Sequence, residues 1–390
     1  MIVSVGAVLA ACSTSHSVAE NADSSTSAPS IDRTILAARG EVVSSSPGLD
    51  SWASVTPAGT RATRIVYRST SGVDGGATTV SGAVFVPGGD RPAGGWPLIA
   101  YAHGTTGISR DCGPSDNAEM FGDIGAVASF VQSGYAVVTT DYQGLGLRTR
   151  TAAHPYLEPR TAAHNVIDAV RAARGIEPTI GPNWVVYGAS QGGNAAWATA
   201  ENQASYGVGN LRGAVASVPL LDAGYLVDRA QDGTLTAGQR WLYPILVGGI
   251  AQADPSIDPD DHLHGPAAGR LATLTSCSGD RDAVAAQVRS ADAATFRADS
   301  PAAAQALRTA IARQSLPQTA TDVPILALYG SVDDIIPVDV MEVTLGEGCA
   351  KGDTVQRVRL EGQGHAANSG ALLRDWIHAR FAGRPTGGDC

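Results

Sequence analysis

Ser190 stands between an apolar run and a stretch of helix-forming residues, with a glycine two positions away on each side. Gly188, Ser190 and Gly192 form the pattern G-x-S-x-G directly after Trp184–Val186. This pattern is typical of a nucleophile elbow, a tight strand-to-helix turn in which the residues two before and two after the serine must lack side chains. Residues 194–200 favour the helix that should follow, and its N-terminal dipole favours an anion near the serine. The segment therefore predicts a nucleophilic serine.

The pattern G-x-S-x-G alone is weak evidence, because a chain with 46 glycines can contain it by chance. Its interpretation as an elbow needs partner residues elsewhere in the chain. A serine hydroxyl needs a histidine to take its proton and a carboxylate to orient that histidine, and in α/β hydrolases the acid precedes the histidine. Asp333 and Asp334 follow the apolar segment 323–330, and His365 follows the strand-like segment 355–360. We predict His365 as the base and Asp333 as the acid, because the functional carboxylate usually stands three residues after the strand's last glycine. Asp334 is the alternative acid.

Acyl transfer also needs hydrogen-bond donors aimed at the oxyanion of the tetrahedral intermediate. Residues 103–107 (HGTTG) follow the apolar run 96–102 and resemble an oxyanion loop. We expect the backbone N–H groups of Thr105 and Gln191 to be the two donors. An ordinary glycine-rich turn is the alternative interpretation of this loop.

Strand-like and helix-like segments alternate along much of the chain, which predicts an α/β fold. The first two strand-like segments indicate an antiparallel hairpin, and the later ones are apolar enough for the covered centre of a parallel sheet. The expected strands are 64–68, 79–86, 96–102, 136–140, 184–186, 214–219, 323–330 and 355–360, and the expected helices include 118–133 and 164–174. We predict an α/β-hydrolase fold with a mostly parallel, doubly wound sheet.

A long segment rich in Ala, Asp and Arg interrupts this alternation. We expect residues 220–318 to form a mainly helical cap inserted into one core, whose two parts are 34–219 and 319–390. Within the cap, the segment that contains Trp241 and Tyr243 either lines an acyl pocket, where both would bind substrate, or packs against the sheet domain. The sequence leaves both alternatives open.

Net charge and hydropathy exclude some partners. The formal net charge is -10, the pI is about 5.2, and no basic run is present. A nucleic-acid partner is therefore not expected, because phosphate binding requires a clustered positive face. Beyond the N-terminus, no segment reaches the ~18 consecutive apolar residues of a membrane span.

The N-terminus resembles an export signal. Residues 1–11 are apolar and end in small residues before Cys12, as in a bacterial lipoprotein signal peptide in which the cysteine after the cut carries the lipid. The polar residues 12–33 would then be a flexible tether. The missing Lys or Arg at the start disagrees with this pattern. We predict an exported protein, either secreted or a cell-envelope lipoprotein whose membrane contact is a lipid on Cys12.

The remaining cysteines support export, because an oxidising compartment can pair an even number of them. Cys112, Cys277, Cys349 and Cys390 allow three pairings, and we favour Cys112 with Cys277 and Cys349 with Cys390. His262 and His264 stand among aspartates, but a solvated loop is the better interpretation than a metal site. We expect neither metal nor cofactor.

Several motifs together resemble the secretory lipase family, which is related to fungal lipase A, from about residue 42 to residue 382. The resemblance rests on His103–Thr105, Asp141–Gly146, His154–Tyr156, Gly188–Gly192 and Gly330–Asp333. It implies an α/β hydrolase with a helical cap that hydrolyses carboxylic esters, including acylglycerols, and it adds Tyr142 to the expected substrate-binding residues. Family members often carry Tyr before the serine, where this chain has Ala189.

These observations predict a serine esterase or lipase that acts on a small-molecule or lipid ester through an acyl-enzyme. Short to medium acyl chains are expected, because only 5% of the residues are aromatic and no extended lipid-binding surface is evident. An acyltransferase or a peptidase would use the same acyl-enzyme. A binding protein that has kept the hydrolase fold without catalysis is the alternative from another class.

Overall fold

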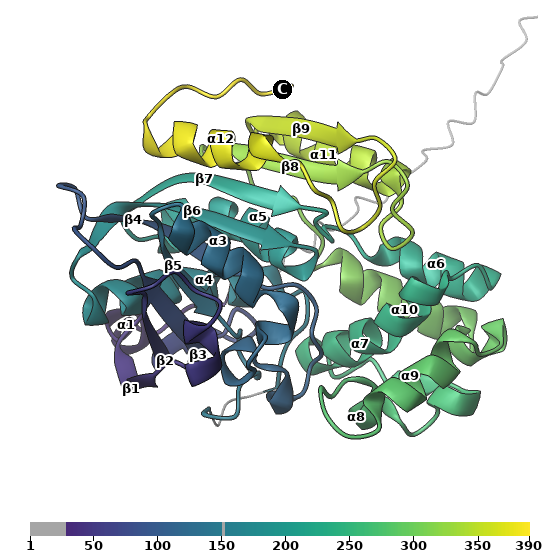
Figure 1. The fold of residues 1–390 in the computed structure, drawn as a ribbon. Coiled ribbons are helices and arrows are strands. Elements are labelled where there is room, and N and C mark those ends of the chain that lie inside the picture. Colours follow the sequence, from purple (N-terminus) through teal and green to yellow (C-terminus); the bar gives the residue numbers. More distant parts are fainter. Residues whose placement is uncertain (1–28, 150–152) are drawn as a thin grey trace, which may run out of the picture.

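The computed structural model describes residues 29–149 and 153–390, and among them nine strands form a single sheet in the order β1-β2-β3-β5-β4-β6-β7-β8-β9 (Figure 1). The antiparallel hairpin predicted near the start is confirmed, and β3 also pairs antiparallel with β5, whereas all later pairs are parallel. The strands are β1 (Val42–Pro47), β2 (Arg61–Thr70), β3 (Ala77–Val86), β4 (Trp96–Ala102), β5 (Ala136–Thr140), β6 (Ile180–Ala189), β7 (Asn210–Ser217), β8 (Ile325–Gly330) and β9 (Val355–Leu360). Strand β1 is a polar edge strand that the sequence analysis does not predict.

Helices cover both faces of the sheet, so successive residues of a central strand enter two separate cores. In β4, Leu98 and Ala100 join one apolar cluster, while Ile99 and Tyr101 join the other. The helices packed on the first cluster are α4 (Pro159–Ile176), α5 (Gln191–Tyr206) and α11 (Val338–Lys351), and those on the second are α3 (Ile124–Gln132) and α12 (Ala371–Phe381). This two-faced burial explains why the central strands are apolar throughout, and it confirms the predicted doubly wound sheet.

One predicted helix is wrong in its first part. The expected helix 118–133 is a short 3-10 helix, η3 (Met120–Gly122), followed by α3. Met120 and Phe121 have left-handed φ values of 48° and 54°, which an α-helix of L-residues does not tolerate. The remaining short elements of the core are α1 (Arg33–Ala37), α2 (Asp50–Ala53), η1 (Arg110–Cys112) and η2 (Pro114–Asp116).

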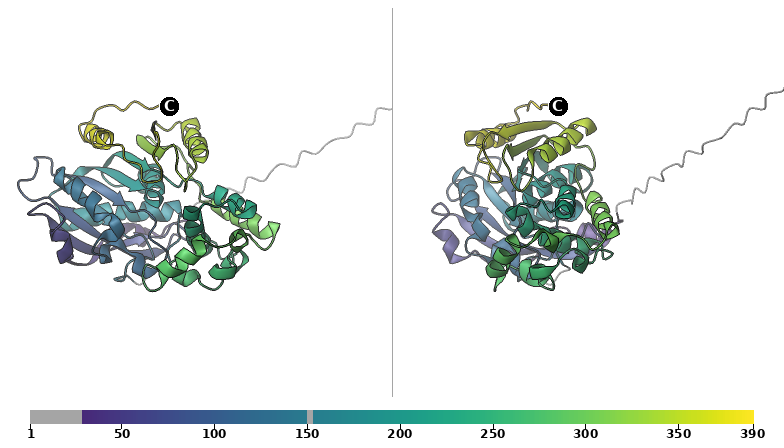
Figure 2. Two further views of the ribbon diagram at one scale, coloured as in Figure 1. Left: turned by 45° about the vertical axis from the view of Figure 1, so that its right-hand side comes forward. Right: turned by 90° about the vertical axis from the view of Figure 1, so that its right-hand side faces the viewer.

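Between β7 and β8, the described residues form helices and no strand. Figures 1 and 2 show these helices together at one end of the sheet, beyond the carboxyl ends of the central strands. They are α6 (Gly224–Asp232), α7 (Ala237–Ala253), η4 (Pro259–Asp261), η5 (Gly265–Ala267), α8 (Leu271–Leu274), α9 (Arg281–Arg289), η6 (Ala293–Phe296) and α10 (Pro301–Ala312). We refer to residues 220–318 as the cap; these boundaries stay a prediction.

Two disulfide bonds connect distant parts of the chain. Cys112 pairs with Cys277, joining η1 of the core to the cap segment after α8, and Cys349 pairs with Cys390, joining α11 to the C-terminus. These are the two pairs favoured from the sequence. The predicted signal peptide, Cys12 and most of the predicted tether lie outside the described residues. Within the part that the structure describes, no helix is both long and apolar enough to cross a bilayer.

Candidate active site

Ser190 occupies a strained turn between β6 and α5. Its φ and ψ values are 57° and -116°, in a region that non-glycine residues rarely adopt. The two flanking glycines make this turn possible by their lack of a side chain. A Cβ on Gly188 would lie 2.1 Å from the carbonyl oxygen of Gly192, and a Cβ on Gly192 would lie 2.0 Å from that of Ala102. The pattern G-x-S-x-G is therefore required by the close packing of β4, β6 and α5.

The imidazole of His365 lies between the Ser190 hydroxyl and the Asp333 carboxylate. His365 Nε2 is 3.0 Å from Ser190 Oγ, and His365 Nδ1 is 2.9 Å from Asp333 Oδ2. The other carboxylate oxygen, Asp333 Oδ1, accepts the backbone N–H groups of Ile335 and Ile336 at 2.8 and 3.0 Å. An ionised carboxylate only accepts hydrogen bonds, so Nδ1 carries the proton and Nε2 is left to accept from the serine hydroxyl.

Asp334, the alternative acid, lies outside this arrangement. Asp334 is exposed, and its backbone carbonyl accepts a hydrogen bond from the Thr236 hydroxyl of the cap at 2.9 Å. Two further cap side chains, Tyr225 and Gln239, donate to the carbonyl of Ile335 at 2.7 and 2.9 Å. The cap therefore contacts the backbone of the acid loop directly.

The loop after β4 lies beside the elbow. A Cβ added to Gly104 would be 3.4 Å from the carbonyl oxygen of Ala189, the residue before Ser190. Next to it, the Thr105 hydroxyl is 2.7 Å from the hydroxyl of Tyr156. Gln191 is the first residue of α5, so its backbone N–H has no acceptor within the helix. The loop that carries Thr105 thus borders the residue before Ser190, and Gln191 begins the helix after it; the role of the two N–H groups as oxyanion donors stays a prediction.

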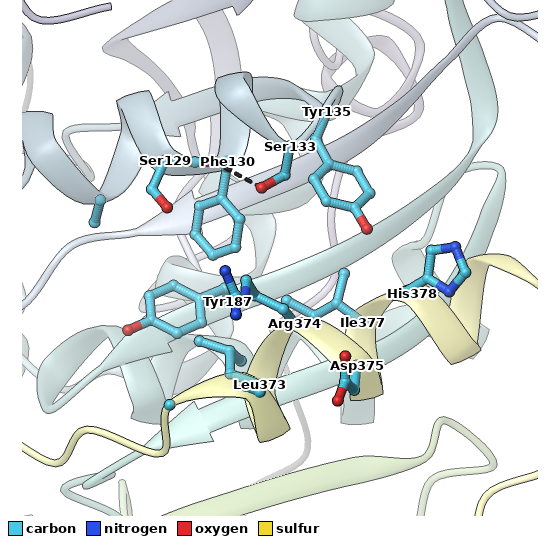
Figure 3. A pocket seen from close by; sticks show the side chains of 13 residues that line it. Ser129, Phe130, Ser133, Tyr135, Tyr187, Leu373, Arg374, Asp375, Ile377 and His378 are labelled. Carbon is cyan, nitrogen blue, oxygen red and sulfur yellow. Dashed lines mark hydrogen bonds between the residues drawn. The ribbon is translucent and has the colours of Figure 1, made fainter.

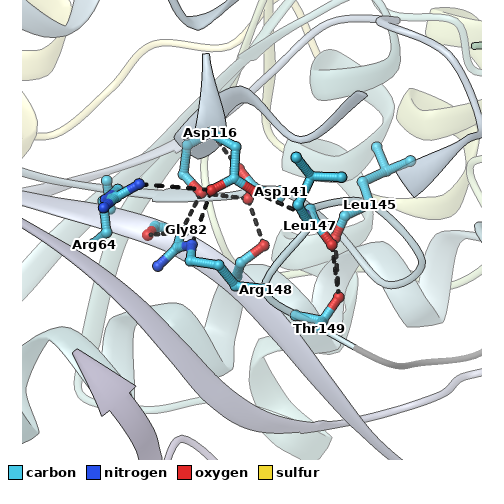
Figure 4. A network of polar contacts seen from close by, with 12 residues as sticks. Arg64, Gly82, Asp116, Asp141, Leu145, Leu147, Arg148 and Thr149 are labelled. Carbon is cyan, nitrogen blue, oxygen red and sulfur yellow. Dashed lines mark hydrogen bonds and ion pairs between the residues drawn. The ribbon is translucent and has the colours of Figure 1, made fainter. Parts of the chain in front are cut away.

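Residues of the tract from Asp141 to Gly146 hold this loop in place through hydrogen bonds to His103. The Tyr142 hydroxyl donates to the His103 carbonyl at 3.1 Å, and His103 Nε2 is 3.2 Å from the Asp141 carbonyl. The buried Asp141 carboxylate accepts hydrogen bonds from Ser115, whose hydroxyl also accepts from Arg148 (Figure 4). The tract is therefore a structural support for the loop that begins at His103.

A second set of buried polar side chains, which sequence reasoning missed, fixes the side chain of Gln191. The Gln191 side-chain amide donates to His154 Nε2 at 2.8 Å, while His154 Nδ1 donates to the carbonyl of Gln143 at 2.9 Å. Burial lowers the pKa of His154 to about 3, so the ring is neutral and its Nε2 stays an acceptor. The sequence signal for this contact is the motif His154–Tyr156.

A comparison with known families decides the identity of the chain. The model of the family described as secretory lipase matches residues 118–389, a span that contains Ser190, Asp333 and His365. The chain belongs to the secretory lipase family. It is therefore a carboxylic ester hydrolase, as the sequence predicted. No curated protein sequence matches this secretory lipase.

Solved structures with the same fold come from a bacterium and a yeast. The rice cell wall degrading esterase LipA from Xanthomonas oryzae has a TM-score of 0.68 and 23% identity, covering 88% of this chain and 98% of its own. Candida antarctica lipase A in its closed state has a TM-score of 0.69 and 17% identity, covering 90% of this chain and 84% of its own. Both likenesses confirm the predicted α/β-hydrolase fold.

The expected substrate-binding tyrosines of this secretory lipase lie in the protein interior. Tyr142 is 1% exposed and supports the His103 loop, and Tyr243 is 0% exposed and packs edge-on against Phe296 within the cap. Both side chains are buried in this conformation, and their assignment as substrate-binding residues stays a prediction. Trp241 is half-buried and packs against the same core, which favours the packing alternative for its segment.

A cavity of about 640 Å³ lies on the face of the sheet covered by α3 and α12 (Figure 3). Phe130, Tyr135 and Tyr187 line it, together with Arg374 and His378 of α12, and neither Ser190 nor His365 does. This cavity therefore does not belong to the arrangement around the serine.

The histidines of the cap belong to ordinary loop structure. His264 Nε2 is 2.9 Å from the carbonyl oxygen of Arg297, and burial lowers the pKa of His262. Within residues 29–149 and 153–390, no group of three or more His, Cys, Asp or Glu side chains is arranged to hold a metal ion.

Proposed function

We propose that this secretory lipase hydrolyses esters through an acyl-enzyme on Ser190, with His365 as general base and Asp333 as the residue that orients it. The observation that carries the proposal is the continuous hydrogen-bond chain from Ser190 Oγ through the imidazole to Asp333 Oδ2, with distances of 3.0 and 2.9 Å. Such a chain allows the histidine to take the serine proton as the hydroxyl attacks, while the carboxylate stabilises the resulting imidazolium.

Two steps complete the reaction. In the first, Ser190 Oγ bonds to the ester carbonyl carbon, the carbonyl oxygen becomes an oxyanion, and His365 returns the proton to the departing alcohol. In the second, water attacks the acyl-enzyme with the same histidine as base and releases the carboxylic acid. The backbone N–H groups of Thr105 and Gln191 stabilise the oxyanion in both steps, and loss of one such donor typically costs ~3 kcal/mol of transition-state stabilisation.

Short- to medium-chain esters are the proposed substrates, and export is proposed as secretion or lipid anchoring through Cys12. The exposed large apolar side chains come from separate segments of the described chain, including Val55, Leu147 and Val343, instead of forming one continuous stretch of sequence. The two disulfide bonds and the family are compatible with an oxidising compartment outside the cytosol. Rates on p-nitrophenyl esters of increasing acyl length should be highest for short to medium chains, and a maximum at long chains with activation by emulsions would contradict this preference.

Labelling with a serine-reactive fluorophosphonate tests the proposed nucleophile directly. Folded protein should give one adduct, on the peptide that contains Ser190, and protein unfolded in urea should give none, because the reaction requires the assembled base and donors. Absence of an adduct in folded, ester-hydrolysing protein would reject Ser190 as the nucleophile. Absence of both adduct and hydrolysis would favour a catalytically silent protein of this fold.

The contact between Gln191 and His154 predicts a loss of rate on substitution of that histidine. Leucine at position 154 removes the acceptor of the Gln191 side chain, whereas glutamine supplies an oxygen near the former Nε2. Removing an oxyanion donor costs about 10²- to 10³-fold in kcat, so misorienting one should cost about tenfold. We expect His154→Leu to lower kcat with little change in KM, and His154→Gln to retain most of the activity.

His164 offers a matched control for this experiment. It is also buried, burial lowers its pKa to about 3, and it stacks on Tyr206, away from the elbow. The variant His164→Leu should therefore lose thermal stability comparable to that of His154→Leu but keep kcat. If both leucine variants lose kcat in proportion to their decrease in Tm, His154 acts only through packing.

A further inference from the structure

A cavity of about 270 Å³ lies beside the loop that follows β4, and the proposed reaction leaves most of its lining without a role. The backbone turn Gly104–Thr106 forms one side of the cavity, and Phe121 and Asp123 form the other. Gly104 also borders Ala189, so the cavity adjoins the elbow of Ser190. We therefore consider an ester whose carbonyl oxygen is bound at the N–H of Thr105. One of its substituents can reach this cavity.

The side of the cavity formed by Phe121 and Asp123 contains residues with an unfavourable backbone conformation. Met120 and Phe121 have φ values of 48° and 54°, a left-handed conformation that is unfavourable for residues other than glycine. Their turn delivers Asp123 to the start of α3, the position where an aspartate normally caps its own helix. Asp123 makes no such capping hydrogen bond. The carboxylate is therefore free of the local role that usually explains an aspartate at this position.

The Asp123 carboxylate keeps unused hydrogen-bonding capacity next to the cavity. One oxygen accepts the hydroxyl of Tyr101 at 2.8 Å, and no other hydrogen bond or ion pair of the carboxylate occurs within the described part of the chain. An ionised carboxylate offers about four acceptor positions. Partial burial raises the pKa of Asp123, while the hydrogen bond from Tyr101 and the nearby His103 lower it. A polar acceptor in such surroundings is costly unless a donor reaches it.

We propose that this cavity receives a hydroxyl-bearing part of the ester and that Asp123 accepts the hydrogen bond of that hydroxyl group. The proposal rests on the proposed function, because it takes the N–H of Thr105 as an oxyanion donor. It narrows the substrate class to short esters with a hydroxyl group close to the scissile bond, on either the acyl or the alcohol side. Plain aliphatic esters supply no second donor beside the Tyr101 hydroxyl and are the poorer substrates.

Two pairs of esters, each differing by a hydroxyl in place of a methyl group, test the proposal and distinguish the two sides. The acyl pair is p-nitrophenyl 3-hydroxybutyrate and p-nitrophenyl 3-methylbutyrate, and the alcohol pair is 2-hydroxyethyl butyrate and propyl butyrate. Each kcat/KM ratio is divided by the ratio of the hydroxide-catalysed rates, which removes intrinsic reactivity. We expect the hydroxyl member to be preferred about tenfold in one pair, the effect of one hydrogen bond to a charged acceptor.

The variants Asp123→Leu and Tyr101→Phe assign this preference to the carboxylate. Asp123→Leu keeps a similar volume but removes the acceptor, so its corrected ratio should fall to about one. Tyr101→Phe removes the other donor to the same carboxylate and should keep the preference. A wild-type ratio near one in both pairs overturns the proposal without any variant, as does an unchanged ratio in Asp123→Leu. Failure to hydrolyse either member, with no fluorophosphonate adduct on Ser190, overturns the proposed function itself.

Discussion

Replacement of Ser190 by alanine is expected to lower kcat by about 10⁴- to 10⁶-fold, because the serine, histidine and acid of such a site act as one unit and loss of the nucleophile removes the covalent pathway. Its hydroxyl is 3.0 Å from His365 Nε2, and alanine leaves that imidazole without a nucleophile to activate. The measurement is kcat and KM on p-nitrophenyl butyrate together with fluorophosphonate labelling. The labelling signal should disappear with the activity.

Stability measurements separate this loss from misfolding. Alanine retains the left-handed strain of position 190, so the Tm of Ser190→Ala should stay close to that of the wild type, whereas Ser190→Gly should be stabilised by about 1 kcal/mol through relief of that strain. Ser133→Ala, at the end of α3, is the matched serine control and should keep full activity. Retained hydrolysis and labelling in Ser190→Ala would place the nucleophile elsewhere.

The sequence predicted the parts of the fold whose signals are local. The elbow could be predicted because the turn leaves no room for side chains at its two glycines: a Cβ added to Gly188 or Gly192 would lie about 2 Å from a backbone oxygen. The sheet could be predicted because β4 to β8 are buried on both faces, which imposes continuous apolar runs. Strand β1, VVSSSP, carries no such signal, because it lies at the sheet edge and has little buried surface.

What escaped prediction depends on backbone conformation and long-range packing. Nothing in the sequence marks Met120 and Phe121 as left-handed, so the pattern predicts a helix through them and assigns no role to Asp123. Tyr243 stands in an apolar stretch of α7 that fits a pocket wall and a cap interior equally well, and only packing against Phe296 separates the two. The partner of His154 lies 37 positions away, beyond the reach of any local pattern.

Asparagine at position 333 is expected to lower kcat by about 10⁴-fold while leaving the fold intact, because it reverses the hydrogen bonding of His365. Asp333 Oδ1 accepts the N–H groups of Ile335 and Ile336, and the amide oxygen of asparagine keeps both contacts. The amide NH₂ group then faces His365 Nδ1, which must become an acceptor. The proton moves to Nε2, and the nitrogen 3.0 Å from Ser190 Oγ no longer takes the serine proton.

The neighbouring Asp334 makes this experiment decisive, because Asp334→Asn is the same chemical change one residue further along the loop. Asp334 is exposed and contacts the cap through its backbone carbonyl, which the substitution leaves in place. The variant Asp334→Asn should keep kcat within about twofold, because substitutions of exposed residues outside the core and the active site usually have small effects. If Asp334→Asn lost the activity and Asp333→Asn kept it, Asp334 would be the acid. The loop would then have to rearrange during catalysis to bring the Asp334 carboxylate to His365.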